Sequence, residues 1–334
     1  MFRTKLAFIT LALATAVAPA AVDFAAAAVR TSPETADDNK TKKGDKKGKK
    51  DDKKDEGRNQ GAKTAGAAAH ADCTITRSSA RLAGLSEASG VAVSRRTPGI
   101  LWSHGDTNPT PTLHAFDTNG AAKGRVRLDA KVTDSEDIAA SSCGSSNCLY
   151  LADIGDNTGR RANIAVLRFP EPAPGDATVG GVESFAATFP DGAQDAEAFF
   201  VTPSGEVFIV TKGETSGSSV YRFPSLKSGS TVVLQKVGTL HEGVVSRGEW
   251  ITGASASPDG RWIALRTHGA VRFYEASRFV KGDFTTPLTF DTGSLKEPQG
   301  EGVALGAGGA LYLTGEGGRK GSPGTLASGV CKLP

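Results

Sequence analysis

Acidic residues recur at matching places along this chain, and their chemistry is the first guide to what the protein could do. Glu136, Glu197 and Glu301 hold the same position in three similar segments. Asp134 and Asp195 stand two residues before the first two of them. Carboxylates gathered at one place repel one another, and in exported proteins a calcium ion with oxygen ligands is a usual compensation. The pattern predicts a calcium site with the three glutamates as ligands and the two aspartates beside them.

The same acids also have an interpretation that needs no ion. Acids at such positions cap strand starts by accepting backbone N–H bonds, or they pair with cationic side chains. Lys212, Arg266 and Arg319 are the cations available for such pairs. Together with Asp106 they lie in loops expected after second strands, so we predict these four as ligand-binding residues.

Catalytic motifs are otherwise sparse. Neither Gly-x-Ser-x-Gly nor His-Glu-x-x-His occurs in the sequence. A hydrolase of phosphoesters or lactones would instead need a base beside a calcium-activated water. Asp153, Asp156 and His268 are the candidate bases.

The segments that carry the acids are copies of one repeat. Positions 89, 136, 197, 252 and 301 are equivalent, and they lie 47, 61, 55 and 49 residues apart. Each copy contains a short apolar run, a turn rich in Gly, Pro or Ser, and further apolar runs. Four antiparallel strands per copy, repeated at this period, are typical of propeller blades. First strands line the channel of a propeller, so we expect the acids to converge at one of its mouths.

The two ends of the chain predict how the ring closes. The fifth copy ends after three strands, and residues 73–82 offer its fourth. We expect an all-β propeller of five four-stranded blades, with six as the alternative, closed by the N-terminal strand pairing with the C-terminal blade. Cys73 and Cys331 would then be neighbours, and a disulfide would lock the closure. Cys143 and Cys148 flank a hairpin turn and suit a local disulfide, with a metal site as the alternative.

A resemblance supports this architecture. Residues 254–265, ASASPDGRWIAL, resemble the Ser-Pro-Asp-Gly hairpin of TolB-like propeller repeats. Residues 73–334 resemble the secreted bacterial propellers grouped with calcium-dependent phytases and lactonases. The resemblance implies a calcium ion in or above the channel. Those relatives commonly have six blades, whereas five copies are found here.

The N-terminal residues have a different character. Residues 1–28 are predicted to be a signal peptide, because Arg3 and Lys5 precede an apolar run that ends in small residues. A retained membrane anchor is the alternative. Residues 29–72 contain no aromatic residue, so we expect a disordered tether rich in Lys and Asp. Its lysines would make weak contact with anionic cell-wall polymer, or the tether would be a solvated spacer.

Charge narrows the function further. The chain has a formal net charge of +3, and no concentrated basic face is evident, so we expect no nucleic-acid binding. We expect a secreted, monomeric module that binds a ligand or an envelope protein, with calcium at the acidic mouth. The alternatives are a calcium-dependent hydrolase of phosphoesters or lactones and an envelope scaffold without metal.

Overall fold

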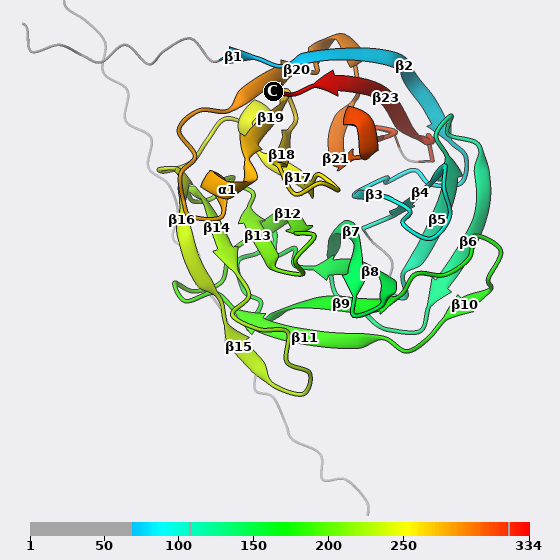
Figure 1. The fold of residues 1–334 in the computed structure, drawn as a ribbon. Helices are drawn as coiled ribbons and strands as arrows, with labels where there is room; N and C mark the ends of the chain where they lie inside the picture. The colour runs from blue at the N-terminus through cyan, green and yellow to red at the C-terminus, as the bar shows by residue number, and fades with distance from the viewer. Residues whose placement is uncertain (1–68, 107–108, 320) are drawn as a thin grey trace, which may run out of the picture. The chain divides into compact units, whose positions relative to one another are not determined.

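The computed structural model describes residues 69–106, 109–319 and 321–334. The predicted signal peptide and most of the predicted tether lie outside these residues. The described strands form five sheets of four or five strands each. The sheets surround a common centre, so the fold is the five-bladed β-propeller that the repeats predict (Figure 1). No helix in the described ranges is long and apolar enough to cross a bilayer.

Each blade is an antiparallel sheet whose first strand lies nearest the channel. Blade 1 contains Val91–Val93 (β3), Ile100–His104 (β4), Thr112–Asp117 (β5) and Ala122–Leu128 (β6). Blade 2 contains Ser135–Cys143 (β7), Ser146–Asp153 (β8), Ile164–Pro170 (β9) and Glu183–Thr188 (β11). Blade 3 contains Ala196–Val201 (β12), Val207–Thr211 (β13), Ser218–Arg222 (β14) and Gln235–His241 (β16). Blade 4 contains Ile251–Ala256 (β17), Trp262–Thr267 (β18), Ala270–Glu275 (β19) and Leu288–Asp291 (β20). Blade 5 contains Gln299–Leu305 (β21), Ala310–Glu316 (β22), Gly324–Lys332 (β23) and Asp72–Leu82 (β2).

In the described part of the chain, four short helical turns interrupt the connections between strands. They are Arg247–Glu249 (η1), Ala276–Phe279 (α1), Gly293–Leu295 (η2) and Ala307–Gly309 (η3).

Three blades carry a fifth strand that the sequence pattern does not predict. Ala69–His70 (β1) pairs in parallel with β20, Thr178–Val179 (β10) with β6, and Thr231–Val233 (β15) with β11. Each added strand belongs to the segment that leads into the outer strand of the next blade. Among the described residues, strand pairing therefore begins at Ala69, before the predicted domain start at residue 73. His70, which was assigned to the tether, pairs with β20.

The ring closes as predicted from the two ends of the chain. β2 pairs antiparallel with β23, and Cys73 stands opposite Cys331. The two cysteines form a disulfide across a sequence separation of 258 residues. Cys143 and Cys148 form the second predicted disulfide, at the turn between β7 and β8. The metal alternative for this pair is therefore excluded.

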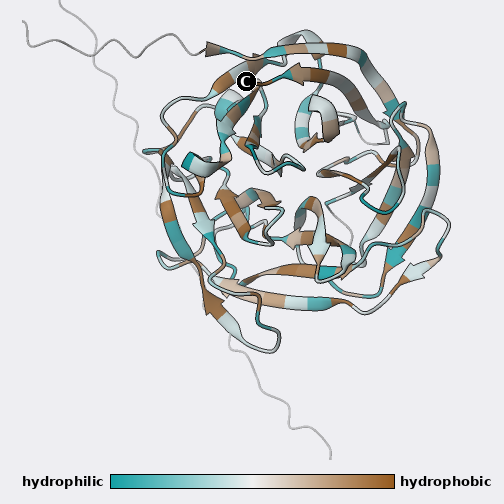
Figure 2. Cartoon of the chain, in the orientation of Figure 1, coloured by the Kyte–Doolittle hydropathy of each residue, from teal (hydrophilic) through white to brown (hydrophobic). Residues whose placement is uncertain are grey.

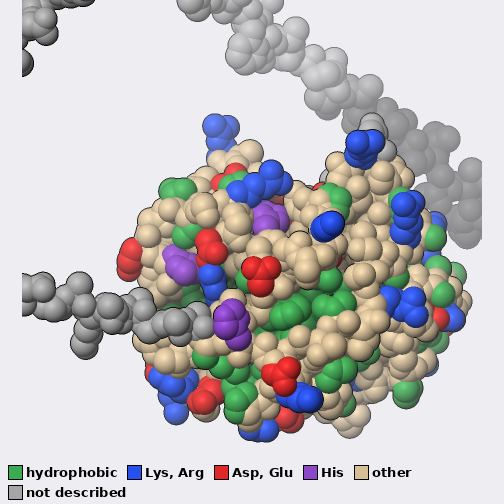
Figure 3. Space-filling view, turned by 90° about the horizontal axis from the view of Figure 1, so that it is seen from above, with side chains coloured by type: hydrophobic (Ala, Val, Ile, Leu, Met, Phe, Trp, Pro, Cys, Tyr) green, Lys and Arg blue, Asp and Glu red, His purple; other side chains and the backbone are tan. Residues whose placement is uncertain are grey.

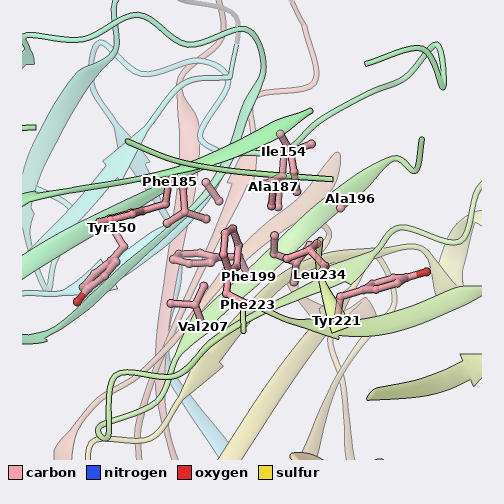
Figure 4. Close-up of a cluster of buried hydrophobic side chains, with 14 of the residues drawn as sticks. Tyr150, Ile154, Phe185, Ala187, Ala196, Phe199, Val207, Tyr221, Phe223 and Leu234 are labelled. Atoms are coloured by element: carbon pink, nitrogen blue, oxygen red, sulfur yellow. The ribbon is translucent and has the colours of Figure 1, made fainter. Parts of the chain in front are cut away.

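The core lies between neighbouring blades, because each blade buries both of its faces. Successive side chains of a strand point to opposite faces. Phe199 of β12 accordingly packs with Phe185 and Tyr150 of blade 2 (Figure 4). Its neighbour Phe200 packs with Ile263 of blade 4. Hydrophobic residues recur along the strands of every blade in Figure 2. Full burial of each Phe side chain contributes roughly 1.5–3 kcal/mol.

The outer surface carries both signs of charge. In the view of Figure 3, basic and acidic side chains are interspersed around a patch of hydrophobic side chains. Interleaved charges of opposite sign keep the local field small. Charge of one sign gathers instead at one mouth of the channel.

Candidate functional site

β-Bulges position the three predicted glutamates. β7 shifts its register against β8 between Ser135 and Asp137, which makes Glu136 an extra residue. β12 has the same irregularity around Glu197, and β21 has one that includes Glu301. A bulge leaves its extra residue unpaired in the ladder and re-aims the side chain. At each of these three bulges, the glutamate therefore does not follow the regular alternation of side chains between the two faces of its strand.

The glutamates converge at one end of the channel. Burial, followed by repulsion from Glu197 and Asp134, holds the pKa of Glu136 well above its ordinary value. Burial and the charge of Glu197 likewise raise the pKa of Glu301. Acids from three blades are therefore close enough to interact electrostatically. We call this end the acidic mouth and define it by Asp134, Glu136, Asp195, Glu197, Lys212, Glu214, Glu301 and Glu316.

Lys212 is the cation at the centre of the blade 3 acids. It directly follows β13, and its Nζ lies 2.7 Å from Glu197 Oε1 and 2.9 Å from Glu214 Oε2. Asp195 Oδ2 is 3.8 Å from the same nitrogen. Burial raises the pKa of Glu197 to about 7, although the Lys212 ammonium opposes the rise. Burial lowers the pKa of Lys212, but the surrounding carboxylates outweigh this and hold it above its ordinary value.

Glu301 is a buried acid of the mouth whose pKa stays well above its ordinary value, although a hydrogen bond from Gln299 and the charge of Arg266 lower it in part. Its side chain is buried, with a relative exposure of 6 % for the residue, and Oε1 has no hydrogen-bond partner. A buried polar atom without a partner costs roughly 1–3 kcal/mol. Such an atom in a native fold indicates a proton, a water or a ligand at that point.

Gly155 leaves space for the carboxyl groups of the blade 2 acids, because it has no side chain. A Cβ atom there would lie 2.1 Å from Glu136 Oε1 and 2.6 Å from Asp134 Oδ2. Both distances are well below van der Waals contact, so the two carboxyl groups lie directly against the glycine. Any larger residue would push them away. The sequence contains this glycine in GDNTGRR, but nothing in the pattern marks its role.

Asp153 and Asp156, two of the predicted bases, stabilise the loop after β8. Asp153 Oδ1 pairs with Arg161 Nη1 at 3.0 Å and accepts the backbone N–H of Asp134 at 2.8 Å. Asp156 accepts the backbone N–H groups of Arg160 and Arg161, at 3.0 and 2.8 Å. Burial raises the pKa of Asp156, but these bonds outweigh it and hold the pKa below its ordinary value. Both carboxylates are thus occupied in shaping the loop.

Arg266 lies inside β18 and not in a loop, which corrects the expected placement. Its side chain is fully buried. Nη1 donates to the carbonyl oxygens of Gly302 at 2.8 Å and Thr314 at 2.6 Å, and Nη2 pairs with Glu297. Arg266 is the penultimate residue of β18, Trp262–Thr267, although it was expected in the loop that follows. The guanidinium therefore ties blade 4 to blade 5 beneath the mouth.

The other predicted residues lie around the rim. His268 is in ring contact with Trp250 at 5.9 Å, and burial lowers its pKa to about 4. Asp106 contributes to the negative field at Glu136. Arg319 is exposed in the loop after β22. Ligand contact by these residues stays a prediction.

Asp137 is the central residue that the sequence analysis missed. It is fully buried, and its Oδ2 accepts the backbone N–H of Phe199 at 3.1 Å and of Ala254 at 3.0 Å. Blades 2 and 4 are not neighbours in the ring, so the bond from Ala254 crosses the channel. Gly90 allows this approach, because a Cβ there would lie 2.4 Å from Asp137 Oδ1. Asp137 therefore joins three blades at the channel axis.

A cavity of about 310 Å³ lies where the inner strands end. We call it the aliphatic mouth. Each inner strand contributes a small or aliphatic side chain, namely Val93, Ala140, Val201, Ala256 and Leu305. Its hydroxyl groups are engaged: Ser255 Oγ accepts the Leu305 N–H at 3.0 Å, and Ser141 Oγ donates to the Thr202 carbonyl at 3.1 Å. These two bonds join neighbouring blades.

The acidic mouth does not have the arrangement of a calcium site. The described ranges contain no group of three or more His, Cys, Asp or Glu side chains placed to hold a metal. Calcium requires six to eight oxygen ligands. Glu197, Glu214 and Asp195 already surround an ammonium group. The calcium ion predicted from the sequence is not confirmed, and the donor set does not fit a resident ion.

No protein-family model and no curated protein matches the chain. Solved structures with a similar chain course include the PQQ-bound aldose sugar dehydrogenase of Streptomyces coelicolor, with 12 % identity and a TM-score of 0.48, covering 79 % of this chain and 99 % of that one. A gluconolactonase of Xanthomonas campestris has 11 % identity and a TM-score of 0.44, with 81 % and 99 % covered. Regucalcin, a calcium-binding protein of Agrobacterium tumefaciens, has 12 % identity and a TM-score of 0.40, with 79 % and 96 % covered. Likeness at this level carries no information about the activity of this chain.

Proposed function

We propose that this propeller is a binding module whose acidic mouth receives a positively charged group of a ligand or partner protein. The observation that carries the proposal is the buried Glu301 Oε1, which has no hydrogen-bond partner. Glu136 stands in the same field, and the charged groups that raise its pKa are all acids. A cation entering this space would gain both a hydrogen bond and a strong electrostatic attraction in a region of low dielectric constant.

An ammonium group suits the site better than a metal ion. An ammonium has three donors, and Lys212 already satisfies such a group with carboxylates at 2.7 and 2.9 Å. The acids of blades 2 and 5 offer a comparable set of acceptors. A primary amine, the side chain of a lysine or the N-terminus of a partner protein would meet this chemistry.

Calcium and hydrolysis are not part of the proposal. Calcium remains a prediction from the acid pattern, and the titration below tests it as a competing occupant. For hydrolysis, Asp153 and Asp156 are held by Arg161 and backbone N–H groups, so their contacts do not favour a role as bases. The hydrolase stays a hypothesis without a supporting contact of its own.

We further propose that the protein functions in an oxidising, extracellular setting. Two disulfides support this, since such bonds persist mainly in exported proteins. We therefore propose an envelope protein with an exposed amine as the partner. Export by the predicted signal peptide and the monomeric state belong to the same proposal.

Calorimetric titration of the full chain with 1,5-diaminopentane, a lysine-containing peptide and calcium chloride tests the proposal. We expect heat with the amines, and at least tenfold weaker binding in Glu301→Gln and Glu136→Gln. Glu206→Gln is the matched control, because Glu206 pairs with Arg222 on the exposed surface at 3.4 Å. Equal amine affinity in wild type and Glu301→Gln would contradict the proposal, as would the absence of heat with every amine.

A further inference from the structure

The aliphatic mouth is a cavity with a floor and not an open channel. Ile138 of β7 and Ala254 of β17 line it next to the channel axis. Asp137 lies directly behind them, and its carboxylate accepts the backbone N–H groups of both residues, at 2.9 and 3.0 Å. Asp137 itself is fully buried, so the cavity ends at this level. The backbone donors of these floor residues are therefore already bonded.

The wall of the cavity is mostly aliphatic. Within the described ranges its polar side chains are four serines, one asparagine and one arginine, and it contains no aromatic ring. Ser94 Oγ donates to Glu171, and Ser257 Oγ accepts the Trp262 N–H at 2.9 Å, so these hydroxyls are engaged like those of Ser141 and Ser255. A flat ring such as a nucleobase would find no aromatic surface to stack on. A flexible aliphatic chain suits this lining better, because it would bury apolar surface there.

Arg95 is the one charged residue that lines the cavity in the described part of the chain. It is exposed and lies in the turn between β3 and β4. Bonds on both sides fix this turn: the Arg95 N–H donates to Glu171 Oε2 at 3.2 Å, and its carbonyl accepts Asn147 Nδ2 at 3.3 Å. Ser94 Oγ accepts the Thr97 N–H at 2.8 Å. Among the described residues no carboxylate forms an ion pair with the Arg95 guanidinium, so it is available to an anion.

The nearby acids on this side of the ring are engaged by donors of their own. Glu171 is buried and accepts the bonds of the Arg95 turn. Asp259 accepts the backbone N–H of Arg261 at 3.1 Å. Glu206 pairs with Arg222 at 3.4 Å. The acidic mouth thus holds a carboxylate oxygen without a partner, whereas this mouth holds a guanidinium without an ion pair.

We propose that the aliphatic mouth is a second binding site, which takes a carboxylate with an aliphatic chain. The chain would fill the cavity, and the carboxylate would pair with Arg95. A guanidinium binds a carboxylate through two parallel N–H bonds, and the chain would remove apolar surface from water. The cavity, at about 310 Å³, has the size of a small-molecule site. Asp137 separates this site from the acidic mouth, so the inference does not depend on the amine site.

Calorimetric titration of the full chain with sodium octanoate tests this inference. We expect heat with the wild type and at least tenfold weaker binding in Arg95→Gln, because the ion pair is lost. Butyrate should bind at least tenfold more weakly than octanoate, since it buries less of the chain. Octan-1-ol has the chain without the charge and should bind the wild type and Arg95→Gln equally. Arg77→Gln is the matched control, because Arg77 is exposed on the outer strand β2.

A second variant tests the cavity itself. Ala140→Leu narrows the cavity and should weaken the binding of octanoate and of octan-1-ol alike. If Ala140→Leu does not fold, Ala256→Leu on the opposite wall replaces it.

Several outcomes would overturn the inference. They are the absence of heat with octanoate, equal octanoate affinity in the wild type and Arg95→Gln, and unchanged affinity in the folded cavity variant. Octanoate binding that is lost in Glu301→Gln would assign the ligand to the other mouth. Binding of a peptide with a C-terminal leucine, but not of octanoate, would assign the cavity to a partner protein. The amine titrations use different probes and different variants, so the two proposals fail separately.

Discussion

The two mouths of the channel differ sharply, although the same five inner strands form both. At the acidic mouth, bulges turn Glu136, Glu197 and Glu301 towards one another. At the aliphatic mouth, the same strands run in regular register and end in small side chains around a cavity of about 310 Å³. Asp137 separates the two ends. The regular part of each repeat builds the fold, and its irregular residues build the site.

The largest effect is expected from removing the group that separates the mouths. Asp137→Ala would leave the backbone N–H groups of Phe199 and Ala254 buried without acceptors. We expect a loss of about 3–5 kcal/mol in the free energy of unfolding, measured by urea denaturation. Asp137→Asn keeps one acceptor oxygen, so its free energy of unfolding should fall by clearly less than that of the alanine variant. A loss below about 1 kcal/mol in the alanine variant would refute a bridging role for Asp137.

A smaller effect should appear in the pH dependence of stability. The folded pKa of Glu197 is about 7 against an ordinary value of 4.5, so the folded state binds this proton more tightly than the unfolded state. This proton stabilises the folded state fully below pH 4.5, and the stabilisation is lost as the pH rises to about 7. The free energy of unfolding falls by at most about 3 kcal/mol over this range. Glu197→Gln should remove this part of the slope in urea denaturation between pH 4 and 8. An unchanged slope would mean that other groups cause it, and Glu206→Gln at the exposed end of the same hairpin is the control.

A crowded glycine offers a change confined to the acidic mouth. In Gly155→Ala the new Cβ would displace the carboxyl groups of Glu136 and Asp134. We expect a loss of about 2 kcal/mol in the free energy of unfolding. Calorimetry should show at least tenfold weaker amine binding. Gly175→Ala is the control, because a Cβ at Gly175 meets no atom within 4 Å. Equal losses in both variants would show that the effect is not specific to the mouth.

The smallest effect is expected at the aliphatic mouth. Ser255→Ala removes the acceptor of the Leu305 N–H, which should lower the free energy of unfolding by about 1 kcal/mol. Amine binding should not change, because the hydroxyl lies on the far side of Asp137 from the acids. A weaker amine affinity in this variant would show that the two mouths are coupled.

The sequence predicts the parts of this molecule that repeat. Five copies of one pattern predict five blades, and the position of residues 73–82 predicts the closure by β2. Equivalence of Glu136, Glu197 and Glu301 predicts that they meet, because equivalent residues of inner strands reach the same end of the channel.

Other features depend on contacts between blades, which leave no periodic signal. Asp137 follows Glu136 directly and has no acidic equivalent in the other copies, so its bonds to blades 3 and 4 could not be predicted. Glu197 and Asp195, two of the three carboxylates around Lys212, were expected at a calcium site, since the sequence does not tell which cation stands among them. Arg266 was expected in the loop after its strand, but it is the penultimate residue of β18, and its contacts with Gly302, Thr314 and Glu297 leave no signal in the sequence.

The disulfide between Cys73 and Cys331 also determines how the molecule responds to mechanical tension. It joins neighbouring strands near the two ends of the propeller and encloses almost all of the ring in one covalent loop. A force applied to the chain directly before Cys73 and directly after Cys331 would pass through this one bond, because both cysteines lie at the same end of the antiparallel pair of β2 and β23. The blades between them would carry no load, so a propeller held at its N-terminal side and grasped at its C-terminus would keep both mouths intact under strain.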